Sequence, residues 1–190
     1  MELLNQKKLL SKEEVLLHSL YEFYYENNQI VKMLPVVTGN SPISLRVLDW
    51  FVTNYSKKFD IIYPLKFNSK CINFNVHQDY KNKLKSYNKR FFDPFCRINK
   101  KNLKNKIAFK YNKNKCILTT IGQLNFFRWT IRYNILDFVE ENLDKINEDM
   151  NNKSKIKTKK KIKVNKRVQR INLNTLVDFN LNPHSNKKKI

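Results

Sequence analysis

Hydrophobic side chains recur at helical spacing in the first third of the chain and predict two helices. The first is expected over residues 12–27, where Ser11 and Glu14 would form a capping box. The second is expected over residues 42–57, with Ser41 as its N-cap and a proline in its first turn. Their apolar faces consist of Leu16, Leu20 and Phe23 in the first and of Leu48, Phe51, Val52 and Tyr55 in the second.

The segments on either side of the second helix carry breaks and strand signals. Pro35 and Gly39 are expected to end whatever element forms between the two helices. Residues 59–63 are short and apolar, and residues 71–77 alternate between apolar and polar positions, which is typical of a half-buried strand. These two stretches predict a β-hairpin.

The next apolar positions form a seam with lysines beside it. The seam consists of Tyr80, Leu84, Tyr87 and Phe91. Its spacing predicts a helix that Pro94 would stop before Phe95. Lysines follow the seam at the same spacing, with Lys83 on one side and, on the other, Lys81, Lys85 and Lys89.

The following stretch predicts a second hairpin and two more helices. "KIAFKYNKNKCILTT" reads as two strands with a turn at 112–114. Thr120 and Gln123 form a capping box before a helical stripe, and Asn134 would separate this helix from the next. The expected fold is therefore an α+β domain over residues 1–150, small and mostly helical, with two short β-hairpins.

The composition changes after residue 150. Residues 151–190 begin with "NNKSKIKTKKKIKVNKR", which buries little apolar surface and predicts a disordered basic tail. Within the tail, residues 171–183 form a short apolar motif, "INLNTLVDFNLNP". This motif is a docking peptide for a protein partner, an edge strand that folds back on the domain, or a chance apolar patch.

Positive charge is concentrated in two blocks of the chain. The formal net charge is +22, with +13 in residues 66–115 and +12 in residues 151–190. Residues 1–65 are neutral, and residues 116–150 carry a net charge of −3. The abundance of Lys, Asn and Ile indicates an AT-rich genome, but such a bias would enrich lysine everywhere. The uneven distribution instead favours a surface that binds a polyanion.

Lysine and arginine in these blocks are the candidate contacts to nucleic-acid phosphates. Arg90 and Arg97 can each hold a phosphate through two hydrogen bonds. The expected contacts in the domain are Lys81, Lys85, Lys89, Arg90, Arg97, Lys100 and Lys101. The tail would add Lys159, Lys160, Lys161, Lys163, Lys166, Arg167 and Arg170. Four aromatics could stack on bases, but their spacing favours the core: Tyr87, Phe91, Phe92 and Phe95.

Other chemistry has little support in the sequence. A zinc site would need widely spaced ligands, which disfavours it: Cys71, His77, Cys96 and Cys116. The three cysteines fit a reducing compartment. We find no Gly-rich phosphate loop, no HExxH motif and no nucleophile elbow, so no catalytic residue, cofactor or small-molecule substrate is expected. No apolar run approaches the length of a transmembrane helix and no signal peptide is seen, so an intracellular protein without membrane contact is expected.

Three stretches resemble a conserved, uncharacterised protein family of giant (nucleocytoplasmic large) DNA viruses that includes mimivirus relatives. They are "ISLRVLDWFVTNYSKK", "YKNKLKSYNKRFFDPFCR" and "TTIGQLNFFRWTIRYNILDFVEEN", of which "FDPFCR" and "TIGQLNFFRW" are the most distinctive. The resemblance implies a viral protein and transfers no catalytic residues.

The sequence therefore predicts a protein that binds DNA or RNA without sequence specificity. It would package or organise the genome or its transcripts in a virion or viral factory, and a nuclear location is also compatible with the basic tail. The alternative is a protein-interaction subunit of viral transcription or virion machinery that docks through residues 171–183.

Overall fold

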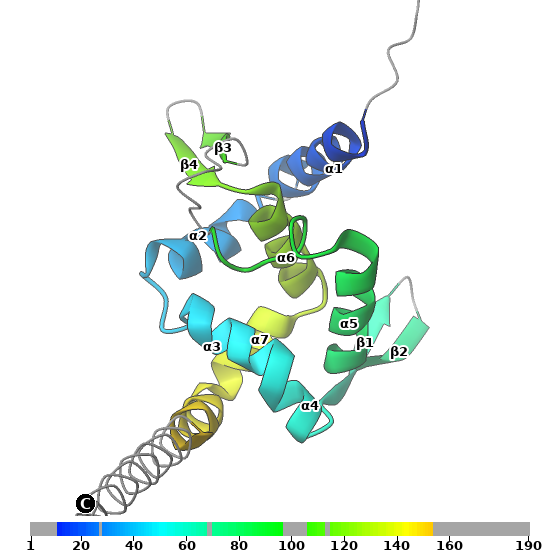
Figure 1. Cartoon of the computed structure of the whole chain (residues 1–190), viewed down its shortest axis with the longest axis vertical. Helices are drawn as coiled ribbons and strands as arrows, with labels where there is room; N and C mark the ends of the chain where they lie inside the picture. The colour runs from blue at the N-terminus through cyan, green and yellow to red at the C-terminus, as the bar shows by residue number, and fades with distance from the viewer. Residues whose placement is uncertain (1–10, 27, 68–69, 97–105, 113–114, 154–190) are drawn as a thin grey trace, which may run out of the picture. The chain divides into compact units, whose positions relative to one another are not determined.

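The computed structural model describes residues 11–26, 28–67, 70–96, 106–112 and 115–153 (Figure 1). The chain divides into two units, Met1–Asn147 and Glu148–Ile190, and only residues 148–153 of the second are described; these six are helical. The elements of the first unit are, in chain order, α1 (Lys12–Glu26), α2 (Ile30–Thr38), α3 (Leu45–Trp50), the π-helical η1 (Phe51–Tyr55), α4 (Ser56–Lys58), β1 (Ile62–Phe67), β2 (Lys70–Asn75), α5 (Val76–Tyr87), β3 (Ile107–Asn112), β4 (Lys115–Thr119), α6 (Ile121–Arg132) and α7 (Ile135–Glu141). The predicted class, mostly helical α+β with two short hairpins, is confirmed.

The N-terminal helices follow the predicted caps with one change. In α1 the Ser11 amide donates to Glu14 Oε2 at 2.8 Å and the Glu14 amide donates to Ser11 Oγ at 3.2 Å, which confirms the capping box. The predicted helix over 42–57 corresponds to α3, η1 and α4, but its N-cap is Ser44, whose side chain accepts from the Val47 amide. The prediction that Ser41 is the cap is wrong: Ser41 Oγ instead accepts from the Ile43 amide, in the turn before the helix.

Helix α2 runs through Pro35, so the prediction that this proline ends the element is wrong. The helix persists because its apolar face is buried, and this packing outweighs the local cost of the proline. The buried residues are Ile30, Met33 and Val36. The prediction for Gly39 is confirmed: it has a left-handed φ of 79° and ends the helix.

Helix α6 occupies the centre of the first unit, among the helices labelled in Figure 1. Ten of its 12 residues are buried, so it is enclosed on all sides rather than on one stripe. The Tyr24 hydroxyl of α1 donates to the Leu124 carbonyl at 2.7 Å. From the other direction, the Trp129 indole donates to Asp79 of α5 at 2.7 Å. The neighbouring helices are thus fixed by both packing and polar contacts to α6.

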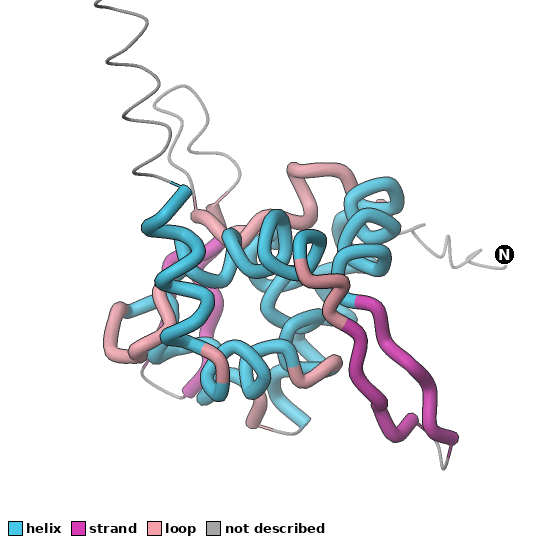
Figure 2. Tube along the Cα trace, turned by 90° about the horizontal axis from the view of Figure 1, so that it is seen from below, coloured by secondary structure: helices cyan, strands magenta, loops and turns pink. Residues whose placement is uncertain are grey.

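The two hairpins lie on different sides of this helical core, and Figure 2 shows β1–β2 extending away from the helices. Strand β2 pairs antiparallel with β1 and ends at Asn75, whose side chain accepts from the Gln78 amide and caps α5. His77 therefore lies in a helix, and the prediction of a strand through residue 77 is wrong. The boundary between β2 and α5 lies at Asn75 because this residue is a strong N-cap, so the helix begins there although the alternating pattern continues to residue 77.

The base of the β1–β2 hairpin is attached to the end of α6. The Tyr63 hydroxyl donates to the Tyr133 carbonyl at 2.8 Å, and the Phe74 and Tyr133 rings stack with centroids 4.7 Å apart. The second predicted hairpin, β3–β4, is also confirmed. Its Phe109 is fully buried against Tyr21 and Tyr24 of α1.

Candidate functional site

Helix α5 ends at Tyr87, and Asn88 follows with a positive φ of 53°, so the prediction that this helix continues to Pro94 is wrong. The chain then crosses the start of α6, where Gly122 allows close approach. A Cβ at Gly122 would lie 2.6 Å from the Arg90 carbonyl oxygen. The Asp93 amide donates to the Gly122 carbonyl at 3.3 Å.

Two buried polar side chains of α6 hold residues 88–96 in place. Gln123 donates to the Pro94 carbonyl at 2.8 Å, and Asn125 donates to the Phe91 carbonyl at 2.9 Å. The strings "FDPFCR" and "TIGQLNFFRW" are therefore in contact. The side chain of Gln123 in the second donates to the Pro94 carbonyl in the first, and the Asp93 amide in the first donates to the Gly122 carbonyl in the second. This contact sets the positions of Lys89 and Arg90 on the surface.

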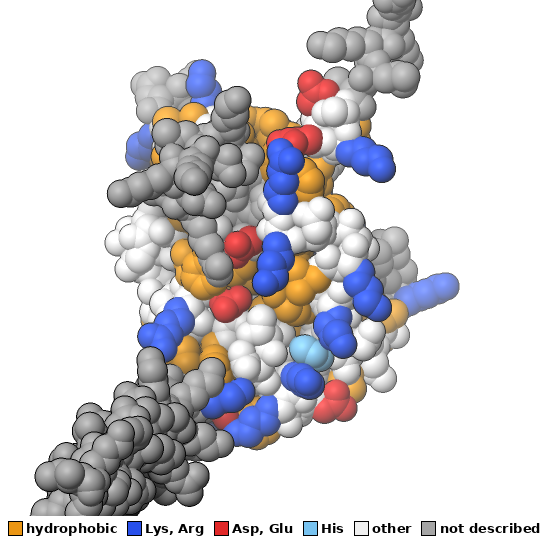
Figure 3. Space-filling model, viewed as in Figure 1, with side chains coloured by type: hydrophobic (Ala, Val, Ile, Leu, Met, Phe, Trp, Pro, Cys, Tyr) orange, Lys and Arg blue, Asp and Glu red, His pale blue; other side chains and the backbone are white. Residues whose placement is uncertain are grey.

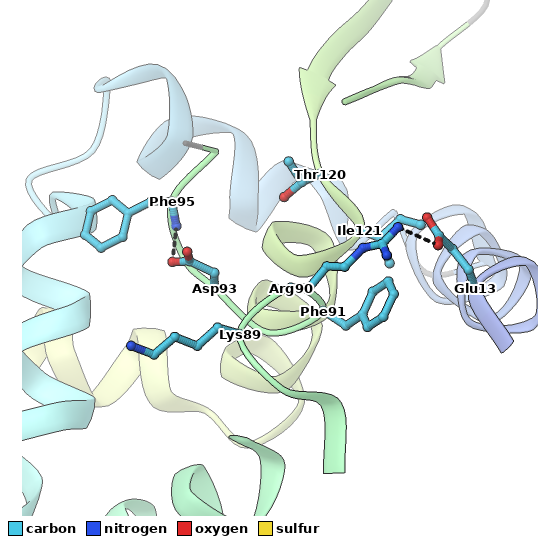
Figure 4. A pocket seen from close by; sticks show the side chains of 8 residues that line it. All are labelled: Glu13, Lys89, Arg90, Phe91, Asp93, Phe95, Thr120 and Ile121. Carbon is cyan, nitrogen blue, oxygen red and sulfur yellow. Dashed lines mark hydrogen bonds and ion pairs between the residues drawn. The ribbon is translucent and has the colours of Figure 1, made fainter. Parts of the chain in front are cut away.

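Lys89 and Arg90 point in different directions, as Figure 4 shows. Arg90 Nη2 lies 3.0 Å from Glu13 Oε2 of α1, and its guanidinium carbon lies 5.0 Å from the centroid of the Phe91 ring. The two residues line opposite parts of a pocket of about 380 Å³ at the start of α6. Arg90 already has an acidic partner, so a phosphate would have to compete with Glu13 for it.

Three of the predicted phosphate contacts are exposed side chains on or just after α5. Among the described residues, no ion pair or side-chain hydrogen bond is formed by Lys81, Lys85 or Lys89. His77 Nδ1 lies 3.4 Å from the Val52 carbonyl of η1, and Lys81 and Lys85 follow His77 by one and two helical turns. Lys81 and Lys85 therefore lie on the side of α5 that faces η1.

Helix α4 adds exposed lysines beside this side of α5, and α4 and α5 are in contact. Lys58 lies over the Phe59 ring, with Nζ 4.7 Å from the centroid. Figure 3 shows Lys and Arg side chains following α4 and α5 on one face, with uncharged side chains between them and acidic ones nearby. We call this set the α4–α5 surface; it consists of Lys57, Lys58, Lys81, Lys85 and Lys89.

The opposite side of α5 faces α6 and carries a second group of cations. Lys83 follows Asp79 by one helical turn, and Asp79 accepts from the Trp129 indole, so Lys83 lies toward α6. There it lines a pocket of about 140 Å³ with Arg128 and Arg132 of α6. We call this the α5–α6 pocket; it is also lined by Tyr87, Phe92, Asn125, Trp129 and Tyr133.

The sequence prediction placed Lys83 correctly, on the other side of the seam, but missed the two arginines. Arg128 and Arg132 fall in the block with a net charge of −3, so composition gave no indication of them. Their i, i+4 spacing in the mostly apolar "FFRWTIRY" was the available signal, because such residues share one helix face.

Only one of the four aromatics expected in the core is fully buried. Phe92 is buried, and its ring centroid lies 5.3 Å from that of Phe126 and 5.4 Å from that of Trp129. Burial raises the pKa of Tyr80 to about 12, and Asp49 and Asp93 act in the same direction. Three aromatics are half-buried: Tyr87, Phe91 and Phe95. None of these side chains is a fully exposed platform for stacking a base.

The cysteines do not gather. Cys71 is exposed on β2 and Cys116 is exposed on β4, in different hairpins. Cys96 Sγ contacts the Leu118 carbonyl at 4.0 Å. In the part of the chain that the structure describes, no three His, Cys, Asp or Glu side chains are grouped so that they could hold a metal ion. Within the same part, no helix is both long and apolar enough to cross a membrane.

The remaining predicted contacts lie outside the described residues and stay predictions. In the domain these are Arg97, Lys100 and Lys101. In the tail they are Lys159, Lys160, Lys161, Lys163, Lys166, Arg167 and Arg170. The apolar motif at 171–183 and the prediction of a disordered tail concern the same undescribed region.

Comparison with known proteins supports the resemblance to giant-virus proteins. Residues 2–188 match a family described as a family of unknown function, DUF7197. The chain is 42% identical over 188 residues to the uncharacterized protein L507 of Acanthamoeba polyphaga mimivirus, which covers 96% of this chain and 70% of that protein. No solved structure matches the chain. With almost its whole length matched, the chain belongs to the DUF7197 family.

Proposed function

We propose that this protein binds nucleic acid through the phosphate backbone, without sequence specificity, and organises or packages the genome or its transcripts in a viral factory or virion. The observation that carries the proposal is the α4–α5 surface. Lys81, Lys85 and Lys89 are exposed there, and no acid among the described residues pairs with them. Such lysines neutralise phosphates and release counterions, which gives affinity for any sequence.

The basic tail supports the same function as a second contact. Residues 151–190 carry a net charge of +12. A tail tethered to the domain meets the same nucleic acid at a high effective concentration, so two weak contacts bind tightly together. DNA and RNA both offer the phosphates that this mechanism needs.

The test is the salt dependence of binding to a labelled oligonucleotide, measured by fluorescence anisotropy with the full chain. If six to eight phosphates are neutralised, log K should fall against log salt with a slope of roughly −5 to −7. Replacing Lys81, Lys85 and Lys89 together with Gln should make this slope less steep by about 2.7. A flat response of the unmodified protein would refute the proposal.

A matched control uses three exposed lysines of the hairpins. Replacing Lys66, Lys70 and Lys115 with Gln removes the same charge but leaves the α4–α5 surface intact. The control should keep the slope of the unmodified protein. If the salt slope decreases equally in both triple variants, the net charge of the protein determines binding and the α4–α5 surface does not.

The alternative is a protein-interaction subunit of viral transcription or virion machinery that docks through residues 171–183. Affinity capture from infected cells, with and without nuclease treatment, separates the two functions. Partners that survive nuclease favour docking through protein contacts, and partners lost with the nucleic acid favour the proposal above.

A further inference from the structure

The α5–α6 pocket brings three cations together around a small space. Lys83, Arg128 and Arg132 line it, and none of the described residues that line it is acidic. Asp79 lies on the same side of α5 but accepts from the Trp129 indole and is not part of the lining. Arg132 lowers the pKa of Arg128, so these two cations repel each other, and an anion that enters the pocket offsets that repulsion.

One of these cations is held in a fixed position. Arg128 Nη1 donates to Ser19 Oγ of α1 at 2.8 Å, and Nη2 donates to Asn125 Oδ1 at 2.7 Å. Burial lowers the pKa of Arg128, and Arg132 acts in the same direction, against the opposing effects of the Tyr87 and Tyr24 hydroxyls. A guanidinium oriented in this way loses little freedom when it binds an oxyanion.

The pocket size selects the ligand class. Pockets for drug-sized ligands usually measure about 300–1,000 Å³. At about 140 Å³, this pocket suits a single compact group rather than a base or a whole nucleotide. A phosphate group combines that size with the oxygens that arginine and lysine bind best.

We propose that Lys83, Arg128 and Arg132 form a site for one phosphate group, distinct from the α4–α5 surface. The phosphate is either free inorganic phosphate or the terminal phosphate of a nucleic acid. Only the second source rests on the proposed function, because free phosphate can bind whether or not the protein holds nucleic acid.

Tryptophan provides a direct readout of this site. The Trp129 side chain lines the pocket, while Trp50 belongs to α3 and is an internal reference. In NMR spectra of protein with labelled tryptophan, inorganic phosphate should shift the Trp129 indole signal in a saturable way. The Trp50 signal should stay constant, and chloride at equal ionic strength should shift neither.

Two single substitutions isolate the site. Lys83→Gln removes a lysine whose Nζ lies 5.9 Å from the Tyr133 ring centroid, and we expect it to weaken phosphate binding about tenfold. Lys115→Gln makes the same charge change at an exposed position of β4, outside both sites, and should leave phosphate binding unchanged. Both variants keep the contacts of Arg128, so both should fold.

A second arm identifies the source of the phosphate. Oligonucleotides of one sequence are compared with a 5′-phosphate and with a 5′-hydroxyl. Tighter binding of the phosphorylated end, lost in Lys83→Gln and kept in Lys115→Gln, supports a terminal-phosphate site. Equal binding of both ends, together with a saturable response to inorganic phosphate, supports a site for free phosphate.

Two results overturn the inference: no saturable shift of Trp129 with either probe, or equal weakening by Lys83→Gln and Lys115→Gln. Neither result bears on the salt slope set by Lys81, Lys85 and Lys89. The failure of this site and the failure of the proposed function are therefore separate observations.

Discussion

Gly122 offers the sharpest test of how residues 88–96 are held on α6. In Gly122→Ala the new Cβ would lie 2.6 Å from the Arg90 carbonyl oxygen and 3.3 Å from the Phe92 amide nitrogen. Both neighbours are backbone atoms, which cannot rotate away as the end of a flexible side chain can. Either the start of α6 or the crossing segment must therefore move.

The expected cost follows from opposing terms. Forcing an extra methyl group into a packed site costs about 1–3 kcal/mol. A shift of the segment also weakens the hydrogen bonds from Gln123 and Asn125, each worth about 1 kcal/mol. Alanine favours the helix over glycine by at most about 1 kcal/mol. The net prediction is a loss of about 2 kcal/mol, or a drop in Tm of roughly 4–8 °C.

The assay is urea unfolding followed by far-UV circular dichroism, with Gly39 as the comparison. A Cβ at Gly39 meets no atom within 4 Å, but its φ of 79° penalises alanine by about 1 kcal/mol. Asparagine tolerates that backbone, so Gly39→Asn should cost less than Gly39→Ala. Gly122→Asn should not be more stable than Gly122→Ala, because any side chain at this position would clash with the backbone of residues 90–92. A Gly122→Ala protein as stable as the unmodified one would refute the close packing.

Two further predictions concern charges on the surface. The Ser11 amide and hydroxyl lower the pKa of Glu14 in the folded protein. The Glu14 carboxylate therefore stabilises the fold at pH values above its ordinary pKa of 4.5, and this stabilisation is lost as the pH falls through the lowered pKa of the folded state. Thermal unfolding measured across pH should show this loss of stability in the unmodified protein and not in Glu14→Gln. Plots of Tm against pH that run parallel for the two proteins would contradict the prediction. Lys89→Gln should reduce the salt slope of nucleic-acid binding by about 0.9. Arg90→Gln should change this slope little, because Glu13 already pairs with Arg90. A larger change in Arg90→Gln than in Lys89→Gln would show that phosphate displaces Glu13.

Local chemistry made several elements predictable from the sequence. The capping box at Ser11 and the N-cap at Thr120 use side chains within three residues of each other, so the sequence alone specifies them. The predicted box at Thr120 is not completed, because the Gln123 side chain donates to the Pro94 carbonyl and accepts from Thr119. Short alternating or apolar runs also predict both hairpins, but the first strand spans 62–67 and not the predicted 59–63, because residues 59 and 60 form the turn after α4. The break after Tyr133 follows from Asn134, which adopts a left-handed φ of 53°.

Predictions failed where contacts distant in sequence decide the structure. The apolar seam on α5 continues to Phe91, yet the helix ends at Tyr87 because α6 binds the following backbone through Gln123 and Asn125. An apolar stripe was expected on α6, but polar residues are enclosed as well. Their partners lie 29 and 34 residues away, beyond the reach of any periodicity.

The position of each lysine on α5 explains how one basic block forms two different surfaces. Lys81 and Lys85 face η1, and Lys83 faces α6, since residues four apart share a side and residues two apart do not. Exposed lysines gain affinity mainly by counterion release, so their contribution falls steeply with salt. The pocket cations include the partly buried Arg128, whose interaction with an anion is screened less. Salt should therefore remove binding at the α4–α5 surface before it removes a phosphate group from the α5–α6 pocket, because the two surfaces hold phosphate by different means.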